Sequence, residues 1–174
     1  METSTYPKTK IYNTRLEKFF VEELKEIYGA ERYFQNSLGK MRDAATNKKL
    51  IKVLNDQKRV TIDQMSRLED AFRCLGKRIE FLRCEVMENL VKQTWYSIEK
   101  TAGNSKAMDV ALIHSCHKIR HFEVAAYHGL ISMAETLDYC KIKQLLNETL
   151  QEDKEAVEMF SLLPKWEITY QSAN

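Results

Sequence analysis

The sequence predicts an all-α fold built from four long helices and one additional connecting helix. Apolar residues recur at alternating three- and four-residue spacings along four long stretches, as on the buried face of a helix. The two prolines, Pro7 and Pro164, lie near the ends of the 174 residues, so no proline interrupts the stretches between them. With 44% hydrophobic and 30% charged residues, we expect one domain with a substantial core.

The first long helix is expected to start at Asn13 or Thr14 and to end near Arg42, after a flexible segment of residues 1–12. Glu31 lies in the middle of its apolar stripe. Gly29 lies inside the helix and suggests close packing nearby. The expected inner stripe is Phe20, Leu24, Ile27, Glu31, Phe34, Leu38 and Met41.

The second long helix is expected to begin after a cap at Thr46 or Asn47 and to end near Leu75, before Gly76. The short link makes the first two helices antiparallel neighbours. The middle of the second stripe is polar but uncharged, with Val60 beside it. This stripe is Leu50, Leu54, Gln57, Thr61, Gln64, Leu68 and Phe72.

A connecting helix is expected over about residues 82–102, followed by a break at residues 103–105. The third long helix then covers about 106–135. It contains the segment HKIRHFEVAAYHGL, in which Glu123 shares a stripe with Ile119 and Leu130. A carboxylate facing a core is costly unless it is paired, protonated or bound to a metal ion.

The fourth long helix is expected over about 138–163, with Pro164 ending it and residues 164–174 forming a tail. Glu152 lies at its middle. The expected inner stripe is Leu145, Thr149, Glu152, Ala156, Met159 and Leu163.

Four long helices joined by short, long and short connections describe a ferritin-like antiparallel four-helix bundle over residues 13–163, with the connecting helix as a crossover. Facing helices of that class hold two metal ions with inward Glu and His side chains. Glu31, Glu123 and Glu152 lie at matched depths, so we expect a shared polar centre. The alternative is that each acid tilts to the bundle edge or pairs with Lys or Arg.

Arg120 argues against a working di-metal centre, as does the lack of any Glu-x-x-His pair. A guanidinium beside carboxylates supplies positive charge and several hydrogen-bond donors. Without another cation, at least one acid should then have a raised pKa. Tyr127 lies near the phase of Arg120 and either hydrogen-bonds to the acids or packs as a core tyrosine. The remaining polar centre is expected from Gln57, Thr61 and Gln64.

Several segments together resemble the YciE/YciF ferritin-like family. They are IYGAERYF, TIDQMSRLEDAF, RCEVMENLVK, DVALIHSCHKIRHFEVAAYHGL and LLNETLQEDKEA. The resemblance covers about residues 15–163 and implies a bacterial stress-associated protein, usually a dimer, with a di-metal-type site. Carried over by position, the family's inward residues fall on Glu31, Gln57, Val60, Arg120, Glu123 and Glu152.

Only three of those six positions keep an acid, so the resemblance implies a degenerate metal site. Two functional classes follow. The first is a non-catalytic, stress-associated structural or interaction protein, a homodimer with no cofactor and an Arg/Glu ion-paired core. The second is a metal-handling protein or an oxidase or peroxidase-type enzyme, in which Glu31, Glu123 and Glu152 hold iron, manganese or zinc.

Composition excludes other classes. The net charge is +2 without a basic block, which argues against nucleic acid. No long apolar run or signal-peptide pattern occurs, so we expect a cytoplasmic protein with no membrane association. Four widely spaced cysteines without a CxxC motif suit reduced thiols. No specific protein partner is indicated.

Four histidines share one face of the third long helix, almost opposite Glu123: His114, His117, His121 and His128. We expect this face to meet solvent or another subunit. The alternative is a transition-metal site, because histidines four residues apart on a helix bind such ions.

Overall fold

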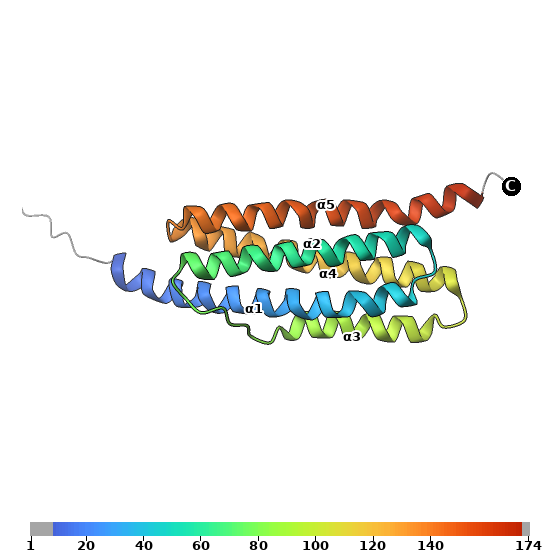
Figure 1. The fold of residues 1–174 in the computed structure, drawn as a ribbon, viewed down its shortest axis with the longest axis horizontal. Coiled ribbons are helices and arrows are strands. Elements are labelled where there is room, and N and C mark those ends of the chain that lie inside the picture. Colours follow the sequence, from blue (N-terminus) through green and yellow to red (C-terminus); the bar gives the residue numbers. More distant parts are fainter. Residues whose placement is uncertain (1–8, 172–174) are drawn as a thin grey trace, which may run out of the picture.

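The computed structural model describes the backbone of residues 9–171 and the side chains of residues 14–163, and this part of the chain contains five helices and no strand (Figure 1). Residues 1–8 and 172–174 lie outside it. The helices are α1 (Thr9–Ala44), α2 (Lys48–Cys74), α3 (Glu85–Lys100), α4 (Ser105–Thr136) and α5 (Cys140–Gln171).

Helices α1, α2, α4 and α5 form a four-helix bundle, and α3 packs outside it against α1 and α4 (Figure 1). Because α3 carries the chain back along the bundle, α2 and α4 run in the same direction at diagonal corners, while every adjacent pair among the four bundle helices is antiparallel. This confirms the ferritin-like bundle with a crossover helix. None of the helices in the described range combines the length and apolar character that a membrane crossing requires.

Polar contacts fix the first connection. Asn47 caps α2, its side-chain oxygen accepting hydrogen bonds from the backbone N–H groups of Lys49 and Leu50 at 2.8 and 3.2 Å. Thr46 instead donates its backbone N–H and its hydroxyl to the carboxylate of Asp109, both at 2.7 Å. Asp109 therefore holds the α1–α2 turn against the start of α4.

The crossover segment between α2 and α3 lies directly on α1. Gly76 ends α2 with a φ of +62°, which glycine adopts without strain. Further along, the backbone N–H of Leu82 donates to the carbonyl oxygen of Lys25 at 3.0 Å, and Glu80 pairs with the Lys25 ammonium. A Cβ at Gly29 would lie 1.9 Å from the Leu82 carbonyl oxygen, so glycine is required for this close approach.

The two chain ends of the bundle differ from the sequence prediction. Helix α1 begins at Thr9, upstream of the expected cap at Asn13 or Thr14. The prediction that Pro164 ends the fourth helix is wrong, because α5 continues to Gln171. Proline removes one backbone donor and crowds the carbonyl four residues earlier, which bends a helix, but later N–H groups can resume the hydrogen-bond ladder.

The predicted inner stripes of α1 and α2 are buried at every position, which confirms them. On α4, Leu112, Cys116, Ile119, Glu123 and Leu130 are also buried. Helices α1, α2 and α4 therefore each bury polar residues within a stripe that is otherwise apolar.

We predict that Gly29→Ala lowers the free energy of unfolding by about 1–3 kcal/mol, because the added methyl group must displace the Leu82 carbonyl. Gly39→Ala in the same helix is the matched control. A Cβ there meets nothing within 4 Å, and the better helix propensity of alanine should stabilise by up to about 1 kcal/mol. Urea unfolding measures both, and equal stabilities of the two variants would contradict the close approach.

Candidate functional site: a buried arginine and three carboxylates

Polar side chains from all four bundle helices meet at the middle of the core, and each is buried. Helix α1 supplies Glu31, α2 supplies three uncharged groups, α4 supplies three residues and α5 supplies Asp153. The full set is Glu31, Gln57, Thr61, Gln64, Arg120, Glu123, Tyr127 and Asp153, with exposures from 0% to 6%.

Arg120 lies at the centre of this cluster with its side chain 0% exposed. Its Nη1 donates to Glu123 Oε2 at 2.8 Å and to Asp153 Oδ1 at 2.9 Å, which joins α4 to α5. The guanidinium carbon also lies 5.0 Å from the ring centroid of Phe34 on α1, a cation–π contact. A buried cation is thus compensated by charges and a ring from three helices.

Helix α2 satisfies the other donors of Arg120. Nε donates to Gln57 Oε1 at 3.0 Å, Nη2 to Thr61 Oγ1 at 3.2 Å and Nη1 to Gln64 Oε1 at 3.3 Å. Gln64 in turn donates its amide to Asp153 Oδ1 at 2.9 Å. All three guanidinium nitrogens therefore have acceptors. Val60 is only half-buried.

Glu31 is reached from α4 by Tyr127, whose hydroxyl donates to Glu31 Oε1 at 2.9 Å. Tyr127 is 0% exposed and its pKa is raised, because burial and the nearby carboxylates disfavour a phenolate. Of the two roles considered for Tyr127, the structure therefore supports hydrogen bonding to the acid cluster.

The three carboxyl groups lie near a single positive charge, that of Arg120, and the pKa of each is raised. Burial, together with the charge of Asp153, raises the pKa of Glu31 to about 8. Burial also raises the pKa of Glu123 well above its usual range, against the opposing effect of Arg120. Burial raises the pKa of Asp153 as well, but only to about 6, because Arg120 and Gln64 stabilise its ionised form. Compared with Glu31, Asp153 therefore ionises at a lower pH.

One oxygen of each acid has no hydrogen-bond partner: Glu31 Oε2, Glu123 Oε1 and Asp153 Oδ2. Such oxygens are possible metal ligands. However, Arg120 binds the other oxygens of Glu123 and Asp153, and the cluster contains no imidazole. Within the described residues, no group of three or more His, Cys, Asp or Glu is arranged to hold an ion. The residues present therefore do not fit a di-metal centre.

The prediction that Glu152 faces this centre is wrong. Glu152 lies at the bundle edge, where its side chain is 32% exposed and accepts a hydrogen bond from Arg67 Nη1 at 2.9 Å. Asp153, the next residue, takes the inward position. Four of the six residues in the predicted stripe are buried, while Glu152 and Met159 are only half-buried, because the inward face also takes in Leu146, Asp153 and Phe160. Because stripes through Glu152 and through Asp153 have the same spacing, the sequence contains no pattern that separates them.

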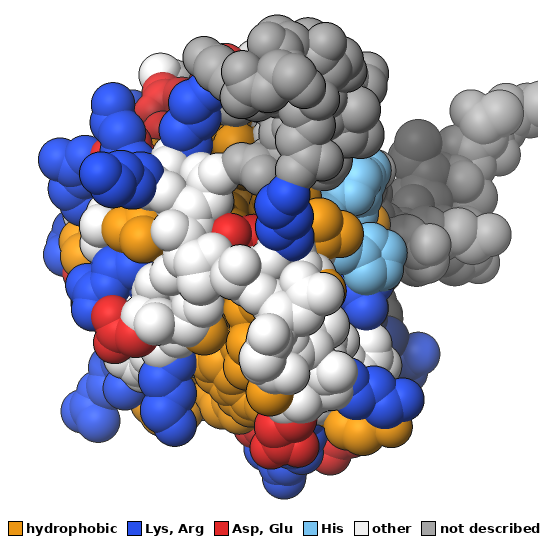
Figure 2. All heavy atoms as spheres, turned by 90° about the vertical axis from the view of Figure 1, so that its right-hand side faces the viewer, with side chains coloured by type: hydrophobic (Ala, Val, Ile, Leu, Met, Phe, Trp, Pro, Cys, Tyr) orange, Lys and Arg blue, Asp and Glu red, His pale blue; other side chains and the backbone are white. Residues whose placement is uncertain are grey.

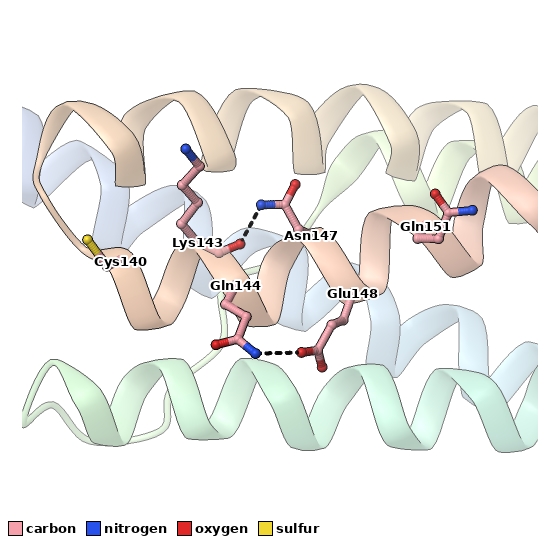
Figure 3. A pocket seen from close by; sticks show the side chains of 6 residues that line it. All are labelled: Cys140, Lys143, Gln144, Asn147, Glu148 and Gln151. Carbon is pink, nitrogen blue, oxygen red and sulfur yellow. Dashed lines mark hydrogen bonds between the residues drawn. The ribbon is translucent and has the colours of Figure 1, made fainter.

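The outer surface of α5 carries an open hollow that is lined by this helix alone (Figure 3). Two hydrogen bonds run along the helix there, from the Gln144 amide to Glu148 Oε1 at 3.2 Å and from the Asn147 amide to the Lys143 carbonyl at 2.9 Å. Its lining is Cys140, Lys143, Gln144, Asn147, Glu148 and Gln151. Since no second helix contributes a group to it, we place the candidate site in the bundle centre.

Comparison with known proteins identifies the family. A family model described as a domain of unknown function, DUF892, matches residues 15–171. The chain belongs to the DUF892 family. Protein YciF of Escherichia coli K12 is 33% identical over 140 residues, which are 80% of this chain and 84% of that protein.

Two solved structures share the fold at a TM-score of 0.81 each. The crystal structure of the E. coli stress protein YciF is 32% identical and covers 85% of this chain and 93% of its own. YcfI, described as a putative structural protein from Rhodopseudomonas palustris, is 28% identical and covers 84% of this chain and 92% of its own. The resemblance to the YciE/YciF proteins and the helical fold are thereby confirmed.

We predict that Arg120→Met destabilises the protein by about 3–5 kcal/mol at pH 8, because an aliphatic side chain leaves the buried carboxyl groups without their cation. Arg67→Met is the matched control. Its ion pair with Glu152 is partly exposed, so the loss should be at most about 1 kcal/mol. Chemical unfolding of both variants tests this, and equal losses would argue against a central role for Arg120.

We predict that the wild-type protein loses more stability than Glu31→Gln as the pH rises from 5.5 to 8. With a folded-state pKa of about 8 and an ordinary value of 4.5, Glu31 keeps a proton in the folded state that the unfolded state releases. Rising pH therefore favours unfolding, by up to about 1.4 kcal/mol per pH unit. Unfolding curves at several pH values measure the difference, and parallel curves for the two proteins would refute the assignment.

Proposed function

We propose that this chain is a non-catalytic, stress-associated structural or interaction protein in which the guanidinium of Arg120 replaces the metal ions of a ferritin-like centre. The observation that carries the proposal is the double contact of Arg120 Nη1, which bonds to Glu123 and Asp153 at 2.8 and 2.9 Å. Because the guanidinium already binds an oxygen of each of these two acids, a divalent ion would have to compete with its fixed positive charge.

The amide and hydroxyl groups of α2 support the same proposal. Gln57, Thr61 and Gln64 present oxygens to a guanidinium, whose planar fork of donors they match. Neutral amides add no negative charge, so two divalent cations would face at most three carboxylates together with Arg120. The stress association rests on similarity to YciF, which is described as a stress protein, and a structural role is in keeping with the description of YcfI.

The assembly in this proposal comes from the family resemblance, and the location follows the expectation from the sequence. The chain is a homodimer in the cytoplasm, acts without a cofactor, and uses neither nucleic acid nor a membrane as its partner. The even mixture of charges, with a net value of +2, is in keeping with these exclusions.

A second candidate is a metal-handling protein or an oxidase or peroxidase-type enzyme using iron, manganese or zinc. It is favoured by the three unpartnered oxygens on Glu31, Glu123 and Asp153. Under this candidate, Asp153 takes the role first assigned to Glu152. Arg120 would have to leave its present contacts before those acids could share an ion.

Metal content separates the two candidates. We predict well under one iron or manganese ion per chain in protein purified after growth with both metals. The triple variant Gln57→His, Val60→Glu and Arg120→Glu should gain binding, because it adds imidazole and carboxylate ligands and removes the central cation. Elemental analysis measures both proteins, and circular dichroism confirms that the variant is folded.

Two results would overturn the proposal. One is stoichiometric iron or manganese in the wild-type protein that disappears in Glu31→Gln or Glu123→Gln. The other is a folded triple variant whose metal content is no higher than that of the wild type.

A further inference from the structure

Two histidines on the outside of α4 bring their ring nitrogens together. His117 and His121 are one helical turn apart, and their Nε2 atoms are separated by 3.2 Å. The rings are tilted by 79°, with centroids 4.5 Å apart. His117 is half-buried and His121 is exposed, so solvent reaches the pair. Histidine side chains also lie at the surface in Figure 2.

Helix α5 adds a third polar atom to this pair. Ser161 Oγ lies 3.0 Å from His117 Nε2 and donates its own proton to the Val157 carbonyl at 2.9 Å. Its lone pairs are therefore left to face the imidazole. The Nε2 atom of His117 on α4 thus lies close to a second ring nitrogen on the same helix and to a hydroxyl oxygen on α5.

The hydrogen bonding of these atoms depends on the tautomers of the two rings. A neutral imidazole carries one N–H, so the contact between the two Nε2 atoms is a hydrogen bond only when one of them is protonated and the other is not. If both Nε2 atoms are instead unprotonated, two lone pairs face each other at 3.2 Å. Burial, with the charges of His121 and His114, lowers the pKa of His117, which favours the neutral form of that one ring.

We propose that His117 and His121 form a surface site for a divalent transition-metal ion of the zinc, copper or nickel class. Two nitrogens bound to a tetrahedral ion at about 2.0–2.1 Å lie about 3.3–3.4 Å apart, close to the spacing already present. Imidazole is a ligand these metals accept, and water completes the coordination beside the Ser161 hydroxyl. The site lies outside the bundle and is independent of the function proposed for its centre.

The test is zinc titration of the full-length protein in competition with a chromogenic chelator. The wild type should bind one ion per chain, and His117→Asn and His121→Asn should each weaken binding at least tenfold. His128→Asn, an exposed histidine on the same helix, is the matched control and should leave the affinity unchanged. Copper bound to the wild type should show nitrogen couplings in its electron paramagnetic resonance spectrum, which the double variant His117→Asn, His121→Asn should lack.

Unchanged zinc affinity in the double variant overturns the surface site. If zinc still binds to the double variant and this binding is lost when Glu123→Gln is added, the ion lies in the bundle centre, which also contradicts the proposed function. Loss of binding in the double variant with full retention in Glu123→Gln supports the surface site and leaves the question of the centre to iron and manganese analysis.

Discussion

The buried guanidinium of Arg120 is the constraint on which the interior of this protein depends. Removing a cation from water costs several kcal/mol unless nearby groups replace its hydration. Helix α4 itself provides Glu123, α5 provides Asp153, and three acceptors come from α2. A slip of α5 against α4 by one turn would separate Arg120 from Asp153, and a slip of α2 would remove three acceptors from the guanidinium, so the network favours one register of these helices.

This network also explains the protonation of the core. One positive charge balances one carboxylate, and Asp153 is the acid with the most donors directed at it. Burial raises the pKa values of Glu31 and Glu123, so each holds its proton to a higher pH than an exposed glutamate does. Such a centre differs physically from one that holds two divalent ions, because it offers fewer negative charges and its cation is covalently part of α4.

Most of the fold follows from periodicity, and the exceptions have physical causes. Glu31 and Glu123 were predictable because each lies within a stripe of apolar residues, and the sequence leaves no doubt which face of the helix that stripe occupies. Asp153 was missed since stripes through Glu152 and through Asp153 have the same spacing, and only the packing of neighbouring helices selects between them. The continuation of α5 beyond Pro164 was missed because a proline is expected to end a helix, whereas the residues after it can resume the helical hydrogen bonds. Hydrogen bonds across helices, such as that from Tyr127, require coordinates.

The most direct test of the central claim is an X-ray structure of crystals soaked in manganese, with anomalous diffraction data. We predict no anomalous peak between Glu31, Glu123 and Asp153, and continuous density for Arg120 bonded to the latter two acids. A manganese peak bound by these carboxylates, with the Arg120 side chain turned away from them, would contradict the account.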